Sequence, residues 1–206
     1  MRNWNNINRL YEQLLQDSYP QPDEEGRTEI TKSIVDSAPI LDMKTILDLG
    51  CGEGYAADLF PNKFYTGVTI SKEDAAKGIS KGRNILVEDF NFSEPVYPFD
   101  LIFSSHSLEH SPFPLITLMV WKELGKNLLL ISPNPDHYGY VGRDHFAVMP
   151  APQLRWLLRR AGWKVTWKIE TATDLAFLCE NVPVLGSEGW ASSLTEEIYR
   201  SDKENL

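Results

Sequence analysis

The sequence predicts an α/β protein in which helices flank both faces of a mostly parallel, doubly wound, seven-stranded sheet, with a helical extension at the N-terminus. Three observations lead to this prediction. The chain has 206 residues, which suits one domain. From residue 45 onward, short apolar runs alternate with helical patterns, as in doubly wound sheets. Several runs, such as Leu101–Ser104, are almost continuously apolar, which indicates strands covered on both faces.

The N-terminal part of the chain has its own helical pattern. Apolar residues recur at three- and four-residue spacing over Trp4–Leu15, and prolines after Tyr19 end this helix. A second helix is predicted over Glu29–Ser37, ended by Pro39. We expect residues 1–44 to form a helical cap of the same domain, residues 45–186 to form its main body, and residues 187–206 to form a C-terminal tail.

The main body contains the predicted strands and the remaining helices. The strands are expected at Thr45–Leu49, Phe64–Thr69, Ile85–Val87, Leu101–Ser104, Leu128–Ser132, Lys164–Ile169 and Leu175–Cys179. Helices are expected at Tyr55–Phe60, Lys72–Ser80, Pro114–Leu124 and Ala151–Ala161. No clear helix separates the last two strands, so we expect them to form an antiparallel hairpin.

Composition excludes several classes of protein. The net charge of −9 argues against sequence-independent binding to duplex nucleic acid. Cys51 and Cys179 are the two cysteines, and they form neither a disulfide framework nor a thiolate zinc motif. The longest apolar region, Phe113–Ile131, contains three charged residues, so no membrane span is expected. The first residues lack the apolar run of a secretory signal, which predicts a soluble, cytoplasmic protein.

The segment Ile46–Gly54, which reads ILDLGCGEG, carries the most information about function. An apolar strand ends in an acidic residue, and three alternate glycines follow before a short helical segment. Glycine permits a tight turn and lets the backbone approach a ligand closely. Such a loop can also serve only to join a strand to a helix.

This segment resembles the first motif of the class I S-adenosylmethionine-dependent methyltransferases, most closely the small-molecule enzymes, and the resemblance extends over Thr45–Asn181. It implies the Rossmann-like form of the predicted fold, S-adenosyl-L-methionine as cofactor and S-adenosyl-L-homocysteine as product. By this resemblance Gly50, Gly52 and the backbone of Cys51 line the amino-acid end of the cofactor. Asp48 supports the loop or reaches the cofactor's ammonium group.

The segment after the second strand departs from the common pattern of this family. The family usually places an acidic residue there to bind the ribose, whereas this chain has Thr69 and Ile70. The stretch GVTISKEDA resembles a variant in cyclopropane-fatty-acid-synthase-like methyltransferases. That resemblance assigns the ribose to Thr69 and Asp74 and places Ile70 against the adenine. An ionised carboxylate at Asp74 can accept both ribose hydroxyl hydrogens.

The next two strands are also followed by residues that match the family. By the resemblance, Asp89 accepts the adenine amino group and Phe90 lies against the ring. Because ligands of open α/β sheets bind outside the carboxyl ends of the strands, Ser104 and Ser105 are expected to face the cofactor's methyl group.

His106, Glu109 and His110 follow at a spacing that places them on one helical face. Three interpretations stay open: a structural role, general base catalysis by His106 or His110, and metal binding. Histidine titrates near neutral pH, which suits a base. We predict no metal, with His106 and His110 as catalytic candidates and His106 facing the reacting methyl group.

The metal interpretation depends on a second resemblance. Small-RNA 3′-terminal methyltransferases carry a Glu-x-x-Glu-His set and a distant histidine that bind a divalent metal, and here His106 replaces the first glutamate. His137 and His145 are the more distant histidines. This resemblance leaves a metal-assisted RNA 2′-O-methyltransferase as an alternative function.

The loop after the fifth strand is rich in aromatic and charged residues, and long loops in compact domains are often functional. Tyr138, Tyr140, His145 and Phe146 are expected to shape an acceptor pocket, or else only to cover the sheet edge. A basic group in the following helix and strand is expected to be a solvated face, comprising Arg155, Arg159, Arg160 and Lys164.

These observations predict an S-adenosylmethionine-dependent methyltransferase that acts on an O, N or C atom of a small-molecule acceptor. Nucleic acid and membrane partners are not expected, and the oligomeric state stays open. A non-catalytic S-adenosylmethionine-binding protein that acts through a partner is the main alternative. A nicotinamide-dependent oxidoreductase is disfavoured because the chain has GxGxG, where that class needs GxGxxG followed by an acidic residue.

Overall fold

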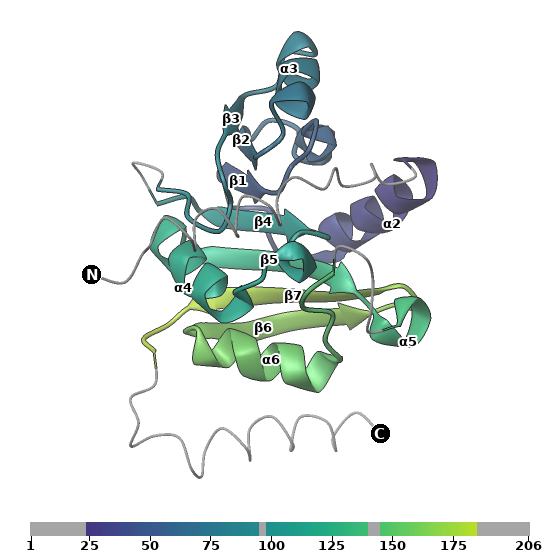
Figure 1. The fold of residues 1–206 in the computed structure, drawn as a ribbon, viewed down its shortest axis with the longest axis vertical. Coiled ribbons are helices and arrows are strands. Elements are labelled where there is room, and N and C mark those ends of the chain that lie inside the picture. Colours follow the sequence, from purple (N-terminus) through teal and green to yellow (C-terminus); the bar gives the residue numbers. More distant parts are fainter. Residues whose placement is uncertain (1–23, 95–97, 140–144, 185–206) are drawn as a thin grey trace, which may run out of the picture.

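The computed structural model describes residues 24–94, 98–139 and 145–184 (Figure 1). The predicted helix over Trp4–Leu15, the predicted tail over residues 187–206 and Tyr140 lie outside these described residues.

The described residues form a seven-stranded sheet in the order β3-β2-β1-β4-β5-β7-β6 (Figure 1). The pairings from β3 through β5 are parallel, and β7 is antiparallel to both of its neighbours, β5 and β6. This confirms the predicted fold, including the closing antiparallel hairpin. The strands are β1 (Thr45–Leu49), β2 (Phe64–Thr69), β3 (Ile85–Val87), β4 (Leu101–Ser105), β5 (Asn127–Pro133), β6 (Trp163–Glu170) and β7 (Asp174–Asn181).

The predicted helices within the described residues form, with differences in the start of one and the type of another, and short helical segments also form at Leu108–His110 and Pro135–Tyr138, where none was predicted. The described helices are α2 (Glu24–Ser37), α3 (Lys72–Ser80), α4 (Pro114–Leu124), α5 (Pro135–Tyr138) and α6 (Ala151–Arg160), with 3₁₀ turns η1 (Tyr55–Leu59) and η2 (Leu108–His110). Helix α2 begins before the predicted start at Glu29, because the apolar periodicity that locates it begins only at Ile30. Segment η1 is a 3₁₀ helix because Gly54, with a φ of 75°, and Pro61 leave too little room for an α-helix.

Each face of the sheet carries a separate hydrophobic core, as expected for strands buried on both sides. Neighbouring residues of β1 alternate between them, so that Leu47 packs with α4 and α6 whereas Ile46 packs with α2 and η1. The α2 residues Ile34 and Val35 belong to the second core, which supports the proposal that residues 1–44 are part of this domain. The boundaries themselves stay a prediction.

Two buried tryptophans tie the α4 side of the core together. Trp121 Nε1 donates to the Phe90 carbonyl at 2.8 Å, and Trp163 Nε1 donates to the Leu118 carbonyl at 2.9 Å. A buried indole N–H needs such a partner. The first bond also anchors the loop after β3, which belongs to the predicted cofactor site.

The expected solvated basic face on α6 is partly wrong. Arg155 is only 6% exposed. It lies beside Leu154 and one helical turn before Leu158, both of which are fully buried, so the edge of the apolar stripe encloses it. The guanidinium of Arg160 lies over the ring of Trp156, with its Cζ 5.5 Å from the ring centroid.

Candidate active site at the carboxyl edge of the sheet

The predicted cofactor residues gather at one edge of the sheet. Strands β1, β2 and β4 are parallel, so the loops that follow them, at residues 50–54, 70–71 and 106–110, leave the same edge. Open α/β sheets bind ligands at this edge, beside the point where the strand order reverses. Here the reversal lies between β1 and β4. The topology therefore supports the predicted location of the site.

The glycine loop has a backbone that other residues do not readily adopt. Gly50 and Gly52 have φ angles of 84° and 54°. The N–H groups of Gly50 and Cys51 both donate to the Val68 carbonyl at 2.9 Å, which ties the loop to β2. A Cβ on Gly50 would lie 2.2 Å from Ser107 Oγ. The loop is therefore held tightly between β2 and the segment that follows β4.

Asp48 lies beneath this loop and is only 3% exposed. Tyr65 Oη donates to Asp48 Oδ2 at 2.5 Å. Burial raises the pKa of Asp48 to about 7, although the Tyr65 hydrogen bond opposes this. Sequence reasoning missed Tyr65. Gly67 of β2 is the register partner of Asp48 in β1. Tyr65 precedes Gly67 by two residues, so the side chains of Tyr65 and Asp48 lie on the same face of the sheet.

Asp48→Asn is expected to stabilise the protein at neutral pH and to flatten its stability profile. The pKa of Asp48 rises from 3.8 to about 7 on folding, so wild-type stability falls as pH rises between about 4 and 7 and is level above. A neutral amide removes this loss, on the order of 4 kcal/mol. Urea unfolding across this pH range measures it, with the exposed Asp42→Asn as control. Identical pH slopes in the wild type and Asp48→Asn would contradict the assignment.

The two predicted ribose residues lie on either side of the β2–α3 junction, Thr69 at the end of β2 and Asp74 in the first turn of α3. Thr69 Oγ1 accepts from the N–H of Ser71, and Ser71 caps the helix by accepting from the N–H of Asp74 at 3.1 Å. Burial raises the pKa of the Cys51 thiol, and the charges of Asp48 and Asp74 add to this effect. The carboxylate of Asp74 is thus electrostatically linked to the glycine loop. Ile70 is partly exposed beside it.

Asp89 and Phe90 are ordered by contacts within the protein. Asp89 Oδ1 accepts from the backbone and side-chain nitrogens of Asn91 at 2.9 and 2.8 Å. The Phe90 ring packs edge-on against Trp121, with centroids 6.0 Å apart, and its Cδ1 lies 3.7 Å from the Cβ position of Gly50. Phe90 therefore borders the glycine loop. Its stacking on adenine stays a prediction.

Ser104 and Ser105 end β4 with hydroxyl groups that have no protein partner. Both Oγ atoms are buried and make no hydrogen bond to any described residue. An unsatisfied buried hydroxyl is unfavourable, so such atoms often mark a place where a ligand or water supplies the partner. This observation supports their prediction as cofactor-binding residues.

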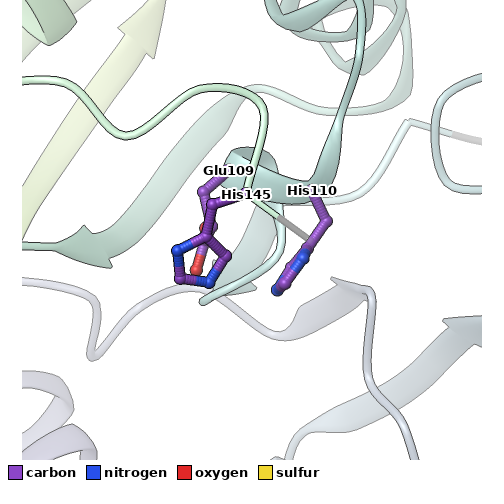
Figure 2. Close-up of side chains that lie close together, drawn as sticks. All are labelled: Glu109, His110 and His145. Carbon is purple, nitrogen blue, oxygen red and sulfur yellow. The ribbon is translucent and has the colours of Figure 1, made fainter. Parts of the chain in front are cut away.

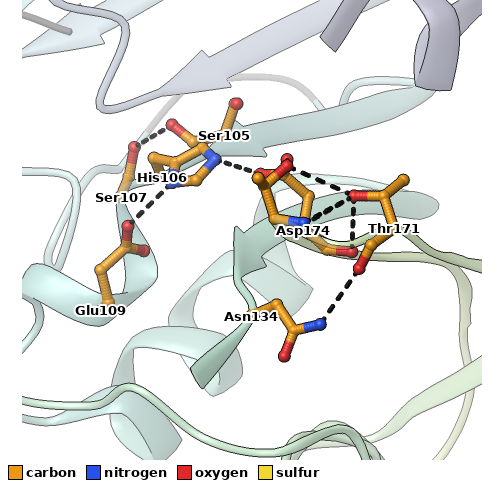
Figure 3. Close-up of polar contacts among 8 residues, drawn as sticks. Ser105, His106, Ser107, Glu109, Asn134, Thr171 and Asp174 are labelled. Atoms are coloured by element: carbon orange, nitrogen blue, oxygen red, sulfur yellow. Dashed lines mark hydrogen bonds and ion pairs between the residues drawn. The ribbon is translucent and has the colours of Figure 1, made fainter. Parts of the chain in front are cut away.

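His106 lies between two buried carboxylates, as Figure 3 shows. Its Nε2 is 2.5 Å from Asp174 Oδ1 and its Nδ1 is 3.5 Å from Glu109 Oε1. Thr173 also donates to Asp174. Both ring nitrogens are thus directed at carboxylates, which favours a positioning role over the predicted place facing the reacting methyl group. Catalysis by His106 stays untested. Sequence reasoning missed Asp174, whose only local signal is a polar residue before an apolar strand.

Glu109, His110 and His145 form a second cluster on the side of η2 (Figure 2). The backbone carbonyl of Glu109 accepts from the N–H groups of Phe146 and Ala147, so this distant segment lies directly on η2. His145 and Phe146 were predicted to shape an acceptor pocket. The described structure brings His145 to His110 and leaves Phe146 largely exposed.

A family model described as a methyltransferase domain matches residues 9–167. The chain belongs to this methyltransferase domain family. No curated protein sequence matches it. The described part of this methyltransferase domain contains no helix long and apolar enough to cross a membrane.

Solved structures with the same fold include several named enzymes. An O-methyltransferase of a Brevibacillus brevis trans-AT PKS multienzyme, in complex with S-adenosyl-L-homocysteine, has a TM-score of 0.64 and 17% identity, covering 96% of this chain and 89% of that one. A Burkholderia thailandensis 1,6-didemethyltoxoflavin-N1-methyltransferase, with its substrate and S-adenosylhomocysteine bound, has a TM-score of 0.64 and 13% identity over 78% and 80%. The [4+2]-cyclase SpnF has a TM-score of 0.65 and 16% identity over 82% and 86%. The class I methyltransferase fold is thereby confirmed.

Proposed function

We propose that this methyltransferase domain transfers the methyl group of S-adenosyl-L-methionine to an O, N or C atom of a small-molecule acceptor and releases S-adenosyl-L-homocysteine. The observation that carries the proposal is the shared edge of the parallel strands β1, β2 and β4, where the glycine loop, the first turn of α3 with Asp74, and Ser104 and Ser105 follow one another; both serine hydroxyls are buried without a hydrogen bond to any described residue. Structures of the same fold that hold S-adenosylhomocysteine support this choice of cofactor.

The residues at this edge fit the cofactor in chemical type. Gly50 to Gly52 would admit its amino-acid end, Thr69 and Asp74 its ribose, and Asp89 with Ile70 and Phe90 its adenine. When bound, the cofactor supplies a methyl group on a sulfonium, which is already a good leaving group. The chain's own task is then to align the acceptor and exclude water. We propose that His110, on the turn after β4, handles the proton that the acceptor loses.

Methyl-labelled S-adenosylmethionine, incubated with the protein and pools of small molecules, tests the function directly. We expect labelled product together with S-adenosylhomocysteine in at least one pool. Tight cofactor binding without turnover in any pool would favour the non-catalytic alternative, and SpnF shows this fold in a protein named for a different reaction. Labelling of small RNA in a parallel pool, and not of small molecules, would contradict the proposed acceptor class.

Asp74→Ala is expected to weaken S-adenosylmethionine binding by about tenfold or more, and Glu73→Ala to leave it nearly unchanged. The Asp74 side chain is 14% exposed, whereas that of the neighbouring Glu73 is 79% exposed. Hydrogen bonds to a charged acceptor contribute ~1.5–3 kcal/mol, which corresponds to this loss. Calorimetric titration measures both variants. Equal affinities for the two would show that another residue holds the ribose.

A further inference from the structure

The strongest unexplained feature of the described structure is the carboxylate of Glu109. The residue is only 1% exposed, and neither Oε1 nor Oε2 makes a hydrogen bond to any described residue. His106 Nδ1 lies 3.5 Å from Oε1, which is too long for a well-formed hydrogen bond. Burial of an ionised carboxylate is unfavourable unless it is paired or bound to a metal.

Three imidazole rings lie close to this carboxylate. His106 Nδ1 lies 3.5 Å from Oε1, and one ring nitrogen each of His110 and His145 lies within 4.8 Å of a Glu109 carboxylate oxygen.

The rings of His110 and His145 form a cluster with the Glu109 carboxylate. Figure 2 shows the His145 ring in front of the Glu109 side chain and the His110 ring beside them. One ligand atom from each of Glu109, His110 and His145 lies within 4.8 Å of the others, and the two imidazole centroids are 4.9 Å apart. The bonds from Phe146 and Ala147 to the Glu109 carbonyl hold the His145 segment in this place. The cluster is thus formed by two segments that the fold brings together.

We propose that Glu109, His110 and His145 bind a divalent transition metal ion, with zinc as the best match. Two imidazoles and one carboxylate are a common zinc set, whereas magnesium and calcium prefer oxygen ligands alone. In a tetrahedral zinc site with bonds of about 2.0–2.1 Å, the ligand atoms lie about 3.4 Å apart. The ligand atoms here lie within 4.8 Å of one another, so the side chains need to close by at most about 1.4 Å when the ion binds.

The proposed site differs from both metal-related expectations. The sequence favoured no metal, and its metal alternative used His106. In the structure, His106 Nε2 bonds to Asp174 and His106 Nδ1 faces Oε1 of Glu109 at 3.5 Å. We therefore assign His106 as a neighbour of the Glu109 carboxylate and not as a metal ligand. A neighbour in that position orients a ligating carboxylate. His145 is one of the two distant histidines that the metal alternative named, and the fold selects it because the chain returns to Glu109 after α4, β5 and α5.

The metal site goes beyond the proposed methyl transfer and does not depend on it. Three protein ligands leave an open position for water or for an acceptor oxygen, as in catalytic zinc sites. Only the use of that position by an acceptor rests on the proposed function. With the ion bound, His110 acts as a ligand and not as a free base, so sensitivity of turnover to a chelator distinguishes its two roles.

Calorimetric titration of zinc chloride into the untagged, chelator-treated full chain tests the proposal without any methyl acceptor. We expect one ion per chain. Glu109→Gln and His145→Ala should each weaken zinc binding by roughly 100-fold or more, beyond the 10–100-fold typical of a lost outer partner. His137→Ala alters an exposed histidine on α5 and should bind as the wild type does.

Several outcomes would overturn the metal site. These are no zinc binding by the wild type, wild-type affinity in both ligand variants, or equal weakening by His137→Ala, which indicates surface binding. Circular dichroism confirms that each variant is folded. His145→Ala provides a second variant if Glu109→Gln does not fold. S-adenosylmethionine affinity, measured separately, reports on the proposed function, so failure of one proposal is distinguishable from failure of the other.

Discussion

Gly50→Ala is expected to lower the affinity for S-adenosylmethionine at least ~100-fold, about 2.7 kcal/mol. The new Cβ would lie 2.2 Å from Ser107 Oγ and 2.5 Å from Ser107 Cβ, and the backbone φ of 84° already disfavours any side chain. The loop would have to move away from the turn after β4. It would then lose the two N–H bonds to the Val68 carbonyl that shape it. Calorimetric titration of the cofactor measures the effect.

Gly82→Ala is the matched control for this substitution. Gly82 has nearly the same φ, 81°, but a Cβ there meets nothing within 4 Å. Both variants therefore lose stability from the left-handed backbone, on the order of 1–2 kcal/mol. Only Gly50→Ala also disturbs the loop. Similar cofactor affinities for the two variants would show that backbone strain, and not the position of the loop, accounts for any change.

His110→Ala is expected to reduce methyl transfer by ~10²–10⁴-fold while cofactor affinity stays within about twofold, the range for a lost acid–base group. His137→Ala, on the exposed face of α5, should behave as the wild type. Rates are measured with the acceptor found by the labelling assay. An unchanged rate in His110→Ala would remove this residue from catalysis.

His106→Ala separates positioning from proton transfer. The imidazole lies between the buried carboxylates of Asp174 and Glu109, so its loss leaves negative charge enclosed and should lower thermal stability clearly. We expect His106→Ala to keep more of the rate of methyl transfer than His110→Ala does, at equal cofactor affinity. A larger loss of rate in His106→Ala than in His110→Ala would favour His106 over His110 as the base.

Local patterns identified the strands and most helices. Strands β1, β2 and β3 begin and end at the predicted residues. Strands β1 and β3 are short, mainly apolar runs bounded by polar or glycine residues. The segment at Tyr55–Leu59 shows where this reasoning fails. Its residues suit an α-helix, but the flanking Gly54 and Pro61 allow only a 3₁₀ turn.

The burial of polar side chains was less predictable. Arg155 was expected in solvent because arginine usually is, yet it lies at the edge of the α6 apolar stripe. Ser104 and Ser105 were expected at the site, but their sequence does not show that both hydroxyls are buried without a protein partner. Burial depends on what packs over a residue, and that neighbour is generally distant in the chain.

By itself, the sequence determined the parallel α/β framework, the glycine loop after β1 and the edge at which the site lies, since periodicity and turn residues act over a few neighbouring positions. The tertiary structure alone decided which polar groups meet. Tyr65 reaches Asp48 across 17 residues, and His106 reaches Asp174 across 68. His145 reaches Glu109 only because the chain returns over η2 after β5 and α5. These pairs form because strands pair in a particular register and because a loop brings a distant segment back to the site. Both depend on parts of the chain that are too far apart for a local sequence pattern to relate.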